Sequence, residues 1–145
     1  MKLTRQPKRA LWIVGVCLAV YGITACSQVS PVSRTERIQM FQNDINAGDW
    51  GSLYKHVHPD GARTTVRPTE YWVGGGGQGV FTEPVAFSFG SISSGGSTRT
   101  VSVSSANADN TEWNGTWEYT MKEDDPDVWY ILRLRHIGSG DYIIP

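Results

Sequence analysis

The densest group of titratable side chains is the stretch HVHPD, residues 56–60. An imidazole beside a carboxylate can transfer protons, so His58 and Asp60 are candidates for catalysis. A second interpretation needs no chemistry, because proline presets its φ angle and the glycine after Asp60 accepts a positive φ, which together make a turn. His56 and His58 would not share a helix face, and no third ligand stands at a metal-binding spacing. We therefore expect a structural turn and no metal site, with catalysis by His58 and Asp60 as the alternative.

Two further stretches resemble ligand-binding loops only in composition. GGGGQG at residues 74–79 lacks the Lys-Ser/Thr ending of a phosphate-binding loop, and we predict a linker or a flexible loop. The acidic stretch 123–127 lacks the spacing and the glycine of a calcium-binding loop, and we predict a solvated hairpin. The sequence therefore predicts no cofactor.

Residues 1–25 have the three zones of a secretory leader: a basic head, an uncharged core over 10–22, and small residues before Cys26. The core is shorter than the about 20 apolar residues that a bilayer span needs. A disulfide at Cys26 would need a lasting partner, and Cys17 lies inside the leader. The polar stretch 27–33 provides no core for a buried thiol. A covalent attachment at Cys26 is the interpretation that remains.

The residues Ile23-Thr24-Ala25-Cys26 resemble the lipobox of bacterial lipoprotein signals. In that family the thiol receives diacylglycerol, cleavage falls just before the cysteine, and the new amino group is acylated. Two or more chains, at about 0.8 kcal/mol per buried methylene, give stable anchoring. The resemblance implies a signal peptide over 1–25, a lipidated N-terminus and linker over 26–32, and a protein held by Cys26 to a bacterial cell membrane, in the outer membrane or an outer leaflet. An ordinary signal peptide or an uncleaved anchor is the alternative.

The chain beyond the leader is acidic. All fourteen acidic residues but only nine of the thirteen basic ones lie there, which gives a formal charge of −5. Such a surface argues against a nucleic-acid partner and against a basic patch that grips anionic lipid.

Helices are predicted first and strands after them, in one α+β domain over residues 33–145. A capping box of Ser33 and Glu36 and an apolar helical spacing predict a helix up to Gly48. A second helix is predicted over 49–58 and a short turn over 68–72. Alternating patterns then predict an antiparallel meander, with strands over 85–89, 101–104, 117–121 and 129–136.

The stretches INAGDWGSLYKHVHPD (45–60) and WEYTMKEDDPDVWYILRL (117–134) resemble the superfamily of nuclear transport factor two-like domains. The resemblance implies N-terminal helices packed in a curved antiparallel sheet, as a cone with a pocket at its open end; a cystatin-like sheet on one helix is the competing fold. The superfamily contains isomerases, dehydratases and hydrolases as well as non-catalytic members, so the fold does not select a function. The candidates for lining such a pocket are Tyr54, Tyr71, Trp72, Trp117, Tyr119 and Arg133.

Strict alternation along the last strand would place Arg133 on one face with Trp129 and Ile131. In the pocket, Arg133 would recognise an anion; on an outer face, its guanidinium would stack on indole rings, which we favour.

The preferred function is a membrane-anchored, non-catalytic binding or accessory module of the bacterial envelope, for a small apolar ligand or a protein partner. The first alternative is a small isomerase, dehydratase or hydrolase that uses His58 and Asp60 in a conical pocket. The second is a purely structural member of an envelope assembly.

Overall fold

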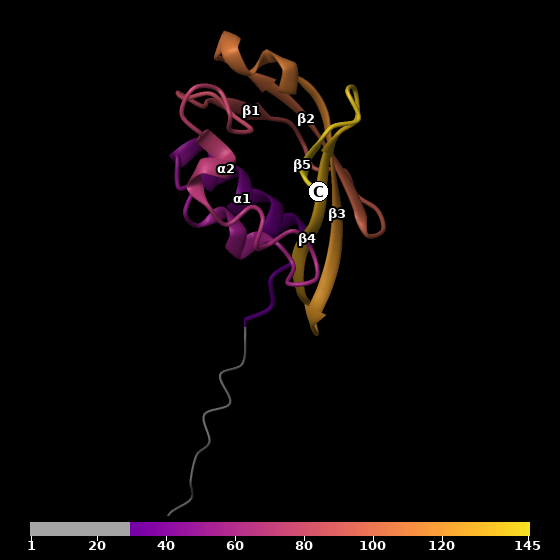
Figure 1. Ribbon diagram of the computed structural model, residues 1–145. Coiled ribbons are helices and arrows are strands. Elements are labelled where there is room, and N and C mark those ends of the chain that lie inside the picture. The colour runs from indigo at the N-terminus through magenta and orange to yellow at the C-terminus, as the bar shows by residue number, and fades with distance from the viewer. Residues whose placement is uncertain (1–29) are drawn as a thin grey trace, which may run out of the picture.

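The computed structural model describes residues 30–145. The leader and Cys26 lie outside the described residues. The domain is α+β, as predicted, and contains one antiparallel sheet of five strands in the order β1-β2-β3-β4-β5 (Figure 1). The strands are β1 (Phe87–Phe89), β2 (Thr98–Ser105), β3 (Gly115–Asp125), β4 (Val128–His136) and β5 (Tyr142–Ile144). Two α-helices, α1 (Arg34–Ala47) and α2 (Thr69–Val73), and two 3-10 helices, η1 (Leu53–His56) and η2 (Ala108–Trp113), complete it. Within residues 30–145, no helix has the length and apolar character to cross a membrane.

Helix α1 begins and ends as its sequence predicts. Ser33 Oγ accepts a hydrogen bond from the amide of Glu36 at 3.2 Å, and the Glu36 carboxylate accepts one from the amide of Ser33 at 2.9 Å. This is the reciprocal capping box, which satisfies amides that the first turn of a helix leaves free. Gly48 ends the helix in the left-handed region at φ 69°.

The predicted second helix is wrong: only the four residues of η1 are helical between 49 and 58. Trp50, Leu53 and Val57 are buried, as the apolar spacing predicted. The backbone around Val57 instead extends and pairs with β4, where the amide of His58 donates to the carbonyl of Ile131 at 2.8 Å. Tertiary pairing with the sheet therefore replaces the last helical turn. The short helix predicted over 68–72 is present as α2.

The four predicted strands are all present, although their ends differ. The fifth strand, β5, was not predicted, because three residues are too few to establish an alternation. The hairpin between β3 and β4 turns at Asp127, which has φ 62°.

The prediction that Arg133 shares a strand face with Ile131 is wrong, because β4 contains a bulge. Thr120 pairs with Arg133, but the next residue, Met121, pairs with Ile131, so Leu132 is an extra residue on β4. An extra residue reverses the alternation beyond it. Ile131 is accordingly fully buried while Arg133 is exposed, and the two do not share a face.

The core is rich in aromatic rings. Phe81 stacks on Trp72 and on Trp117, with ring centroids 6.1 and 6.0 Å apart. Phe41 of α1 meets the edges of Trp72 and Tyr119. Stacked and edge-to-face geometries of this kind add to the stabilisation from buried apolar area.

Asparagine side chains hold the extended segment between α2 and β1. Asn110, which is fully buried, accepts from the amide of Thr82 at 2.8 Å and donates to its carbonyl at 2.7 Å. Asn46 pairs in the same way with Phe87, at 2.9 and 2.8 Å. Each side-chain amide bonds to both backbone groups of one residue, as a neighbouring strand would.

The glycine-rich stretch 74–79 is a closed loop with a narrow neck. A Cβ on Gly79 would lie 2.2 Å from the amide nitrogen of Gly74, whereas one on Gly75 would meet no atom within 4 Å. The backbone on either side is tied by hydrogen bonds from Val80 to Tyr71 and from Phe81 to Trp72. The stretch is therefore a tight loop within the domain, and it is not a linker.

Candidate functional site

The candidate acid–base pair lies where the chain leaves η1 and meets β4. His58 is 3% exposed, and its Nδ1 accepts a hydrogen bond from the amide of Asp60 at 3.0 Å. Because Nδ1 is an acceptor, the neutral imidazole carries its proton on Nε2. That atom is buried and has no hydrogen-bond partner among residues 30–145, where Oδ1 of Asp124 is 3.7 Å away. The ring of His58 is packed edge-on against Tyr130.

Asp60 lies at the surface and pairs with a lysine. Its side chain is 65% exposed and forms an ion pair with Lys122 of β3. The hydrogen bond from Lys122 is the main cause that holds the pKa of Asp60 below its ordinary value. The Asp60 carboxylate is 3.9 Å from Nδ1 of His58, which already accepts the backbone amide. The two side chains therefore do not converge in an enclosed cavity, and they form part of a turn.

His56, the second histidine of the stretch, lies in a separate polar network. Arg37 of α1 donates to Nδ1 of His56 at 3.4 Å, and Nε2 of His56 donates to the Asp44 carboxylate at 2.7 Å. Burial lowers the pKa of His56, against the opposing effect of Asp44. Arg37 also donates to the carbonyl of Trp129 at 2.8 Å, so this network connects α1, η1 and β4. Within residues 30–145, its members bond to one another and to the backbone of β4, so the network is a structural link between these elements.

The third histidine, His136, is a structural residue of the same kind. Its Nε2 donates to the carbonyl of Asn114 at 2.8 Å, and its Nδ1 lies 3.0 Å from Ser139 Oγ. A Cβ on Gly115 would lie 2.8 Å from this ring, so the close approach of β3 requires glycine there.

The aromatic residues proposed to line a pocket divide into two groups. Trp72, Trp117 and Tyr119 are fully buried in the core. The hydroxyl of Tyr119 receives a hydrogen bond from Gln42 at 3.5 Å, and burial raises the pKa of this tyrosine. Tyr54 and Tyr71 are partly buried, and the Tyr71 hydroxyl donates to the carbonyl of Ile143 at 3.0 Å. Three of these side chains are therefore part of the core, and the other two pack against it.

Arg133, the proposed anion-binding residue, is exposed on the outer side of β4 beyond the bulge. It stacks on no ring: the described stacks of guanidinium groups on rings involve Arg34, Arg37, Arg63 and Arg67.

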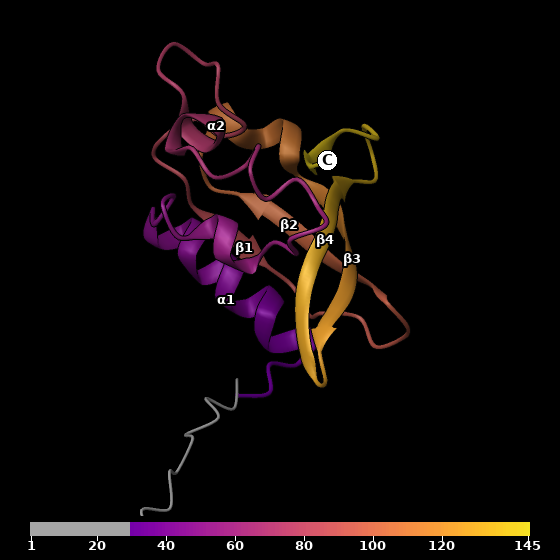
Figure 2. The ribbon, with the colours of Figure 1, turned by 60° about the horizontal axis from the view of Figure 1, so that its bottom comes forward.

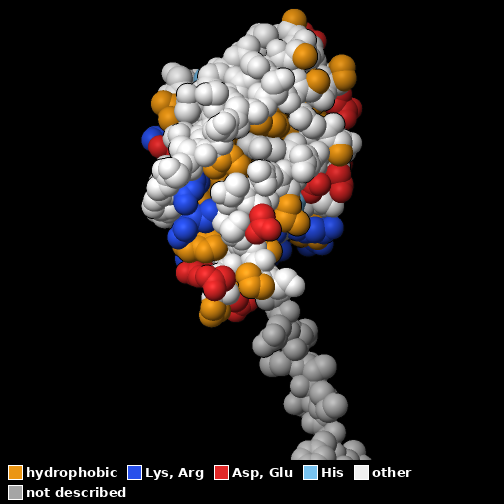
Figure 3. Space-filling view, turned by 180° about the vertical axis from the view of Figure 1, so that it is seen from behind, with side chains coloured by type: hydrophobic (Ala, Val, Ile, Leu, Met, Phe, Trp, Pro, Cys, Tyr) orange, Lys and Arg blue, Asp and Glu red, His pale blue; other side chains and the backbone are white. Residues whose placement is uncertain are grey.

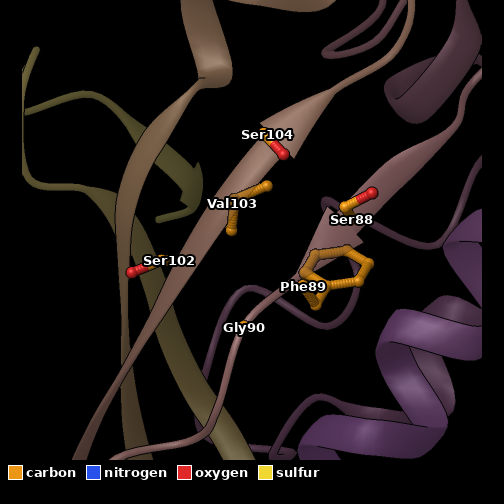
Figure 4. A pocket seen from close by; sticks show the side chains of 6 residues that line it. All are labelled: Ser88, Phe89, Gly90, Ser102, Val103 and Ser104. Carbon is orange, nitrogen blue, oxygen red and sulfur yellow. The ribbon is translucent and has the colours of Figure 1, made fainter.

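The described surface has several shallow hollows. One, of about 310 Å³, lies over β1 and β2, where Ser88 and Ser104 face each other on paired strands beside Phe89 (Figure 4). Another, of about 360 Å³, lies where the described chain begins. Its lining residues are Pro31, Ser33, Arg34, Glu36, Asp127 and Trp129. We call this hollow the tether groove.

The tether groove contains the pair that the sequence did not predict. The guanidinium carbon of Arg34 lies 3.4 Å from the ring centroid of Trp129, a close cation–π contact. Arg34 and Trp129 are far apart in the chain and meet only because Val32 bridges to Val128. The helical pattern placed Arg34 in the first turn of a helix, but nothing in the sequence identified its partner.

No group of three or more histidine, cysteine or acidic side chains that could hold a metal ion exists among the residues that the structure describes.

No protein-family model matches the chain, and neither the curated proteins nor the solved structures contain a significant match to it.

Proposed function

We propose that this protein is a lipid-anchored protein of the bacterial cell envelope whose domain binds a partner and does not catalyse a reaction. The leader with its lipobox-like end at Cys26 supports the anchor. The absence of a strong basic excess beyond the leader supports acyl chains, and not charge, as the means of attachment.

One observation carries the non-catalytic part of the proposal: the candidate acid–base pair is engaged in structural interactions. Nδ1 of His58 accepts a backbone amide, its Nε2 is buried, and the Asp60 carboxylate pairs with Lys122 at the surface. Proton transfer requires both groups to reach one substrate atom, which this arrangement does not offer.

We also propose the nuclear transport factor two-like cone as the finer description of the fold. The order of the elements supports it, and so do contacts of α1 with three strands. Phe41 meets Tyr119 of β3, Arg37 donates to the carbonyl of Trp129 in β4, and Asn46 pairs with Phe87 of β1. Because large aromatic side chains fill the core beneath these contacts, we place the binding surface on the exterior. That choice favours a protein or membrane partner over a small apolar ligand.

The anchor is tested by expressing the full chain in a bacterial host and measuring the mass of the N-terminal peptide. A peptide that begins at Cys26 and carries diacylglycerol is expected, and the Cys26→Ser variant should lack the lipid and leave the membrane fraction. An unmodified Cys26 in a chain that retains residues 1–25 would refute the proposal.

A further inference from the structure

The described chain begins beside the tip of the β3–β4 hairpin. The amide of Val32 donates to the carbonyl of Asp127 at 2.9 Å, and the amide of Trp129 donates to the carbonyl of Val32 at 3.0 Å. Figures 1 and 2 both place the start of the described chain at this end of the domain, away from η2. The first residues of the domain are therefore fixed to the hairpin by backbone hydrogen bonds.

The distance from Cys26 to this end is limited by chain length. Val32 follows Cys26 by six positions, and an extended chain advances at most about 3.6 Å per position, so the span is at most about 22 Å. The headgroup layer adds about 5 to 8 Å beyond the hydrocarbon on each side. With acyl chains on Cys26, the tether groove can lie no further than about 22 Å from the lipidated residue, which keeps it within reach of the headgroups.

The tether groove offers groups of both charges. Arg34 lies flat on Trp129, its Nε is buried without a hydrogen-bond partner, and it forms no ion pair within residues 30–145. Glu36 and Asp127 line the same groove. The hydrogen bonds from Ser33 lower the pKa of Glu36, which keeps it ionised at neutral pH. Three further exposed acidic residues belong to the same hairpin tip: Glu123, Asp124 and Asp125.

The space-filling view shows where the charged side chains of one face gather. Most of the lysine and arginine side chains visible in Figure 3 lie in the half nearest the N-terminal segment, together with several acidic ones, and the far half is mostly uncharged. On this face, both charges therefore gather at the end of the domain where the described chain begins.

We propose that the tether groove binds the headgroup of a zwitterionic aminophospholipid, with the phosphate on Arg34 and the ammonium group toward Asp127 and Glu36. This inference rests on the proposed lipid anchor. A guanidinium group held on an indole face presents its remaining N–H groups to a phosphate, and tryptophan is favoured at the membrane interface. The acidic hairpin tip attracts an ammonium group and repels a net anionic headgroup. Charge complementarity therefore selects phosphatidylethanolamine over phosphatidylglycerol.

The test uses the mature lipidated protein, purified from a bacterial host and reconstituted in three kinds of vesicle. These contain phosphatidylcholine alone, phosphatidylcholine with phosphatidylethanolamine, or phosphatidylcholine with phosphatidylglycerol. Because the thiol of Cys26 is blocked by lipid, Thr35→Cys introduces a single free thiol at an exposed position next to Arg34. A nitroxide on it reports contact with the membrane through its collision rate with a water-soluble relaxation agent. Asp109→Cys, in η2 at the opposite end, is the control position.

The nitroxide at position 35 should be most protected in vesicles with phosphatidylethanolamine and least protected with phosphatidylglycerol, while the control position stays equally accessible in all three. In vesicles with phosphatidylethanolamine, Arg34→Gln should reduce the ratio of tether grooves that hold a headgroup to those that are empty about fivefold. Arg34→Lys, which keeps the charge but loses the planar stack, should reduce it less. Arg133→Gln removes the same charge outside the groove and should have no effect. Asp127→Asn should reduce the difference in nitroxide protection between vesicles with phosphatidylethanolamine and vesicles with phosphatidylglycerol.

Equal accessibility in all three vesicles would overturn the inference, as would greatest protection with phosphatidylglycerol, or equal effects of Arg34→Gln and Arg133→Gln. Mass spectrometry on the same preparation distinguishes the two proposals. An acylated Cys26 without a lipid preference would refute only the headgroup site, whereas an unmodified Cys26 would refute the anchor.

Discussion

Replacing Asn110 by aspartate should make the stability of the domain depend on pH in the opposite sense to ordinary acid denaturation. The amide of Asn110 is fully buried and is bonded to both backbone groups of Thr82. A carboxylate at this position can still accept from the Thr82 amide, but its second oxygen would face the Thr82 carbonyl without a proton to donate. Removing this donor and opposing the Thr82 carbonyl, which then keeps only a 3.4 Å hydrogen bond from Asn107, with a buried charge costs about 2–4 kcal/mol of unfolding free energy.

Protonation of the introduced carboxyl restores the donor. Burial and the facing carbonyl raise its pKa in the folded state above the unfolded value, so the restored hydrogen bond is fully present below the unfolded pKa and is lost as pH rises through the folded pKa. Relative to the unsubstituted protein, Asn110→Asp should therefore be nearly as stable at pH 4 and several kcal/mol less stable at pH 8. Asn110→Ala, which cannot titrate, should be destabilised equally at both values.

Urea denaturation followed by tryptophan fluorescence, on the chain from Ser27 onward, measures these differences at each pH. The comparison with the unsubstituted protein at the same pH cancels the titration of other groups. If Asn110→Asp lost the same free energy at pH 4 and at pH 8, or if Asn110→Ala were neutral, the amide would not be holding the Thr82 segment and the reasoning would fail.

Two other stability measurements test the polar network and the glycine loop. Because burial lowers the pKa of His56 in the folded state, the stability that the neutral imidazole contributes is present above the unfolded pKa near 6.5 and is lost as pH falls. The unsubstituted domain should therefore lose stability between pH 7 and 5, and His56→Gln should reduce that dependence on pH. An unchanged dependence in the variant would contradict this assignment. Gly79→Ala should cost about 1–3 kcal/mol, because its Cβ would meet backbone at 2.2 Å. Gly75→Ala, with no atom within 4 Å, should stay within about 0.5 kcal/mol; equal thermal midpoints for the two variants would show that the neck is not as tight as described.

The local features of the domain follow from sequence patterns that act over a few residues. The capping box at Ser33, the left-handed end at Gly48 and the alternation along β2 and β3 are predicted because each depends on neighbours within about one turn or one strand. The order of helices before a strand meander was predicted for the same reason.

Where interactions between distant residues determine the structure, predictions from these local patterns were wrong. The extra residue at Leu132 reverses the facing of Arg133, and the pairing of Val57 with Ile131 removes the second helix. Neither change has a local signal, because both are determined by the partner strand. The roles of the asparagines were missed for the same reason: an amide that completes a backbone far away in the chain looks like any surface polar residue in the sequence.

The sequence by itself determined the class of the domain and the start and end of α1, and it predicts a leader and a lipid attachment at Cys26, because these depend on composition and on local spacing. Only the tertiary structure decided that His58 and Asp60 do not meet in a cavity, and that Arg34 lies on Trp129 beside the hairpin. The physical reason is that a site is a set of distances between side chains from separate elements, and those distances are set by how the elements pair and pack, which no short window of the sequence contains.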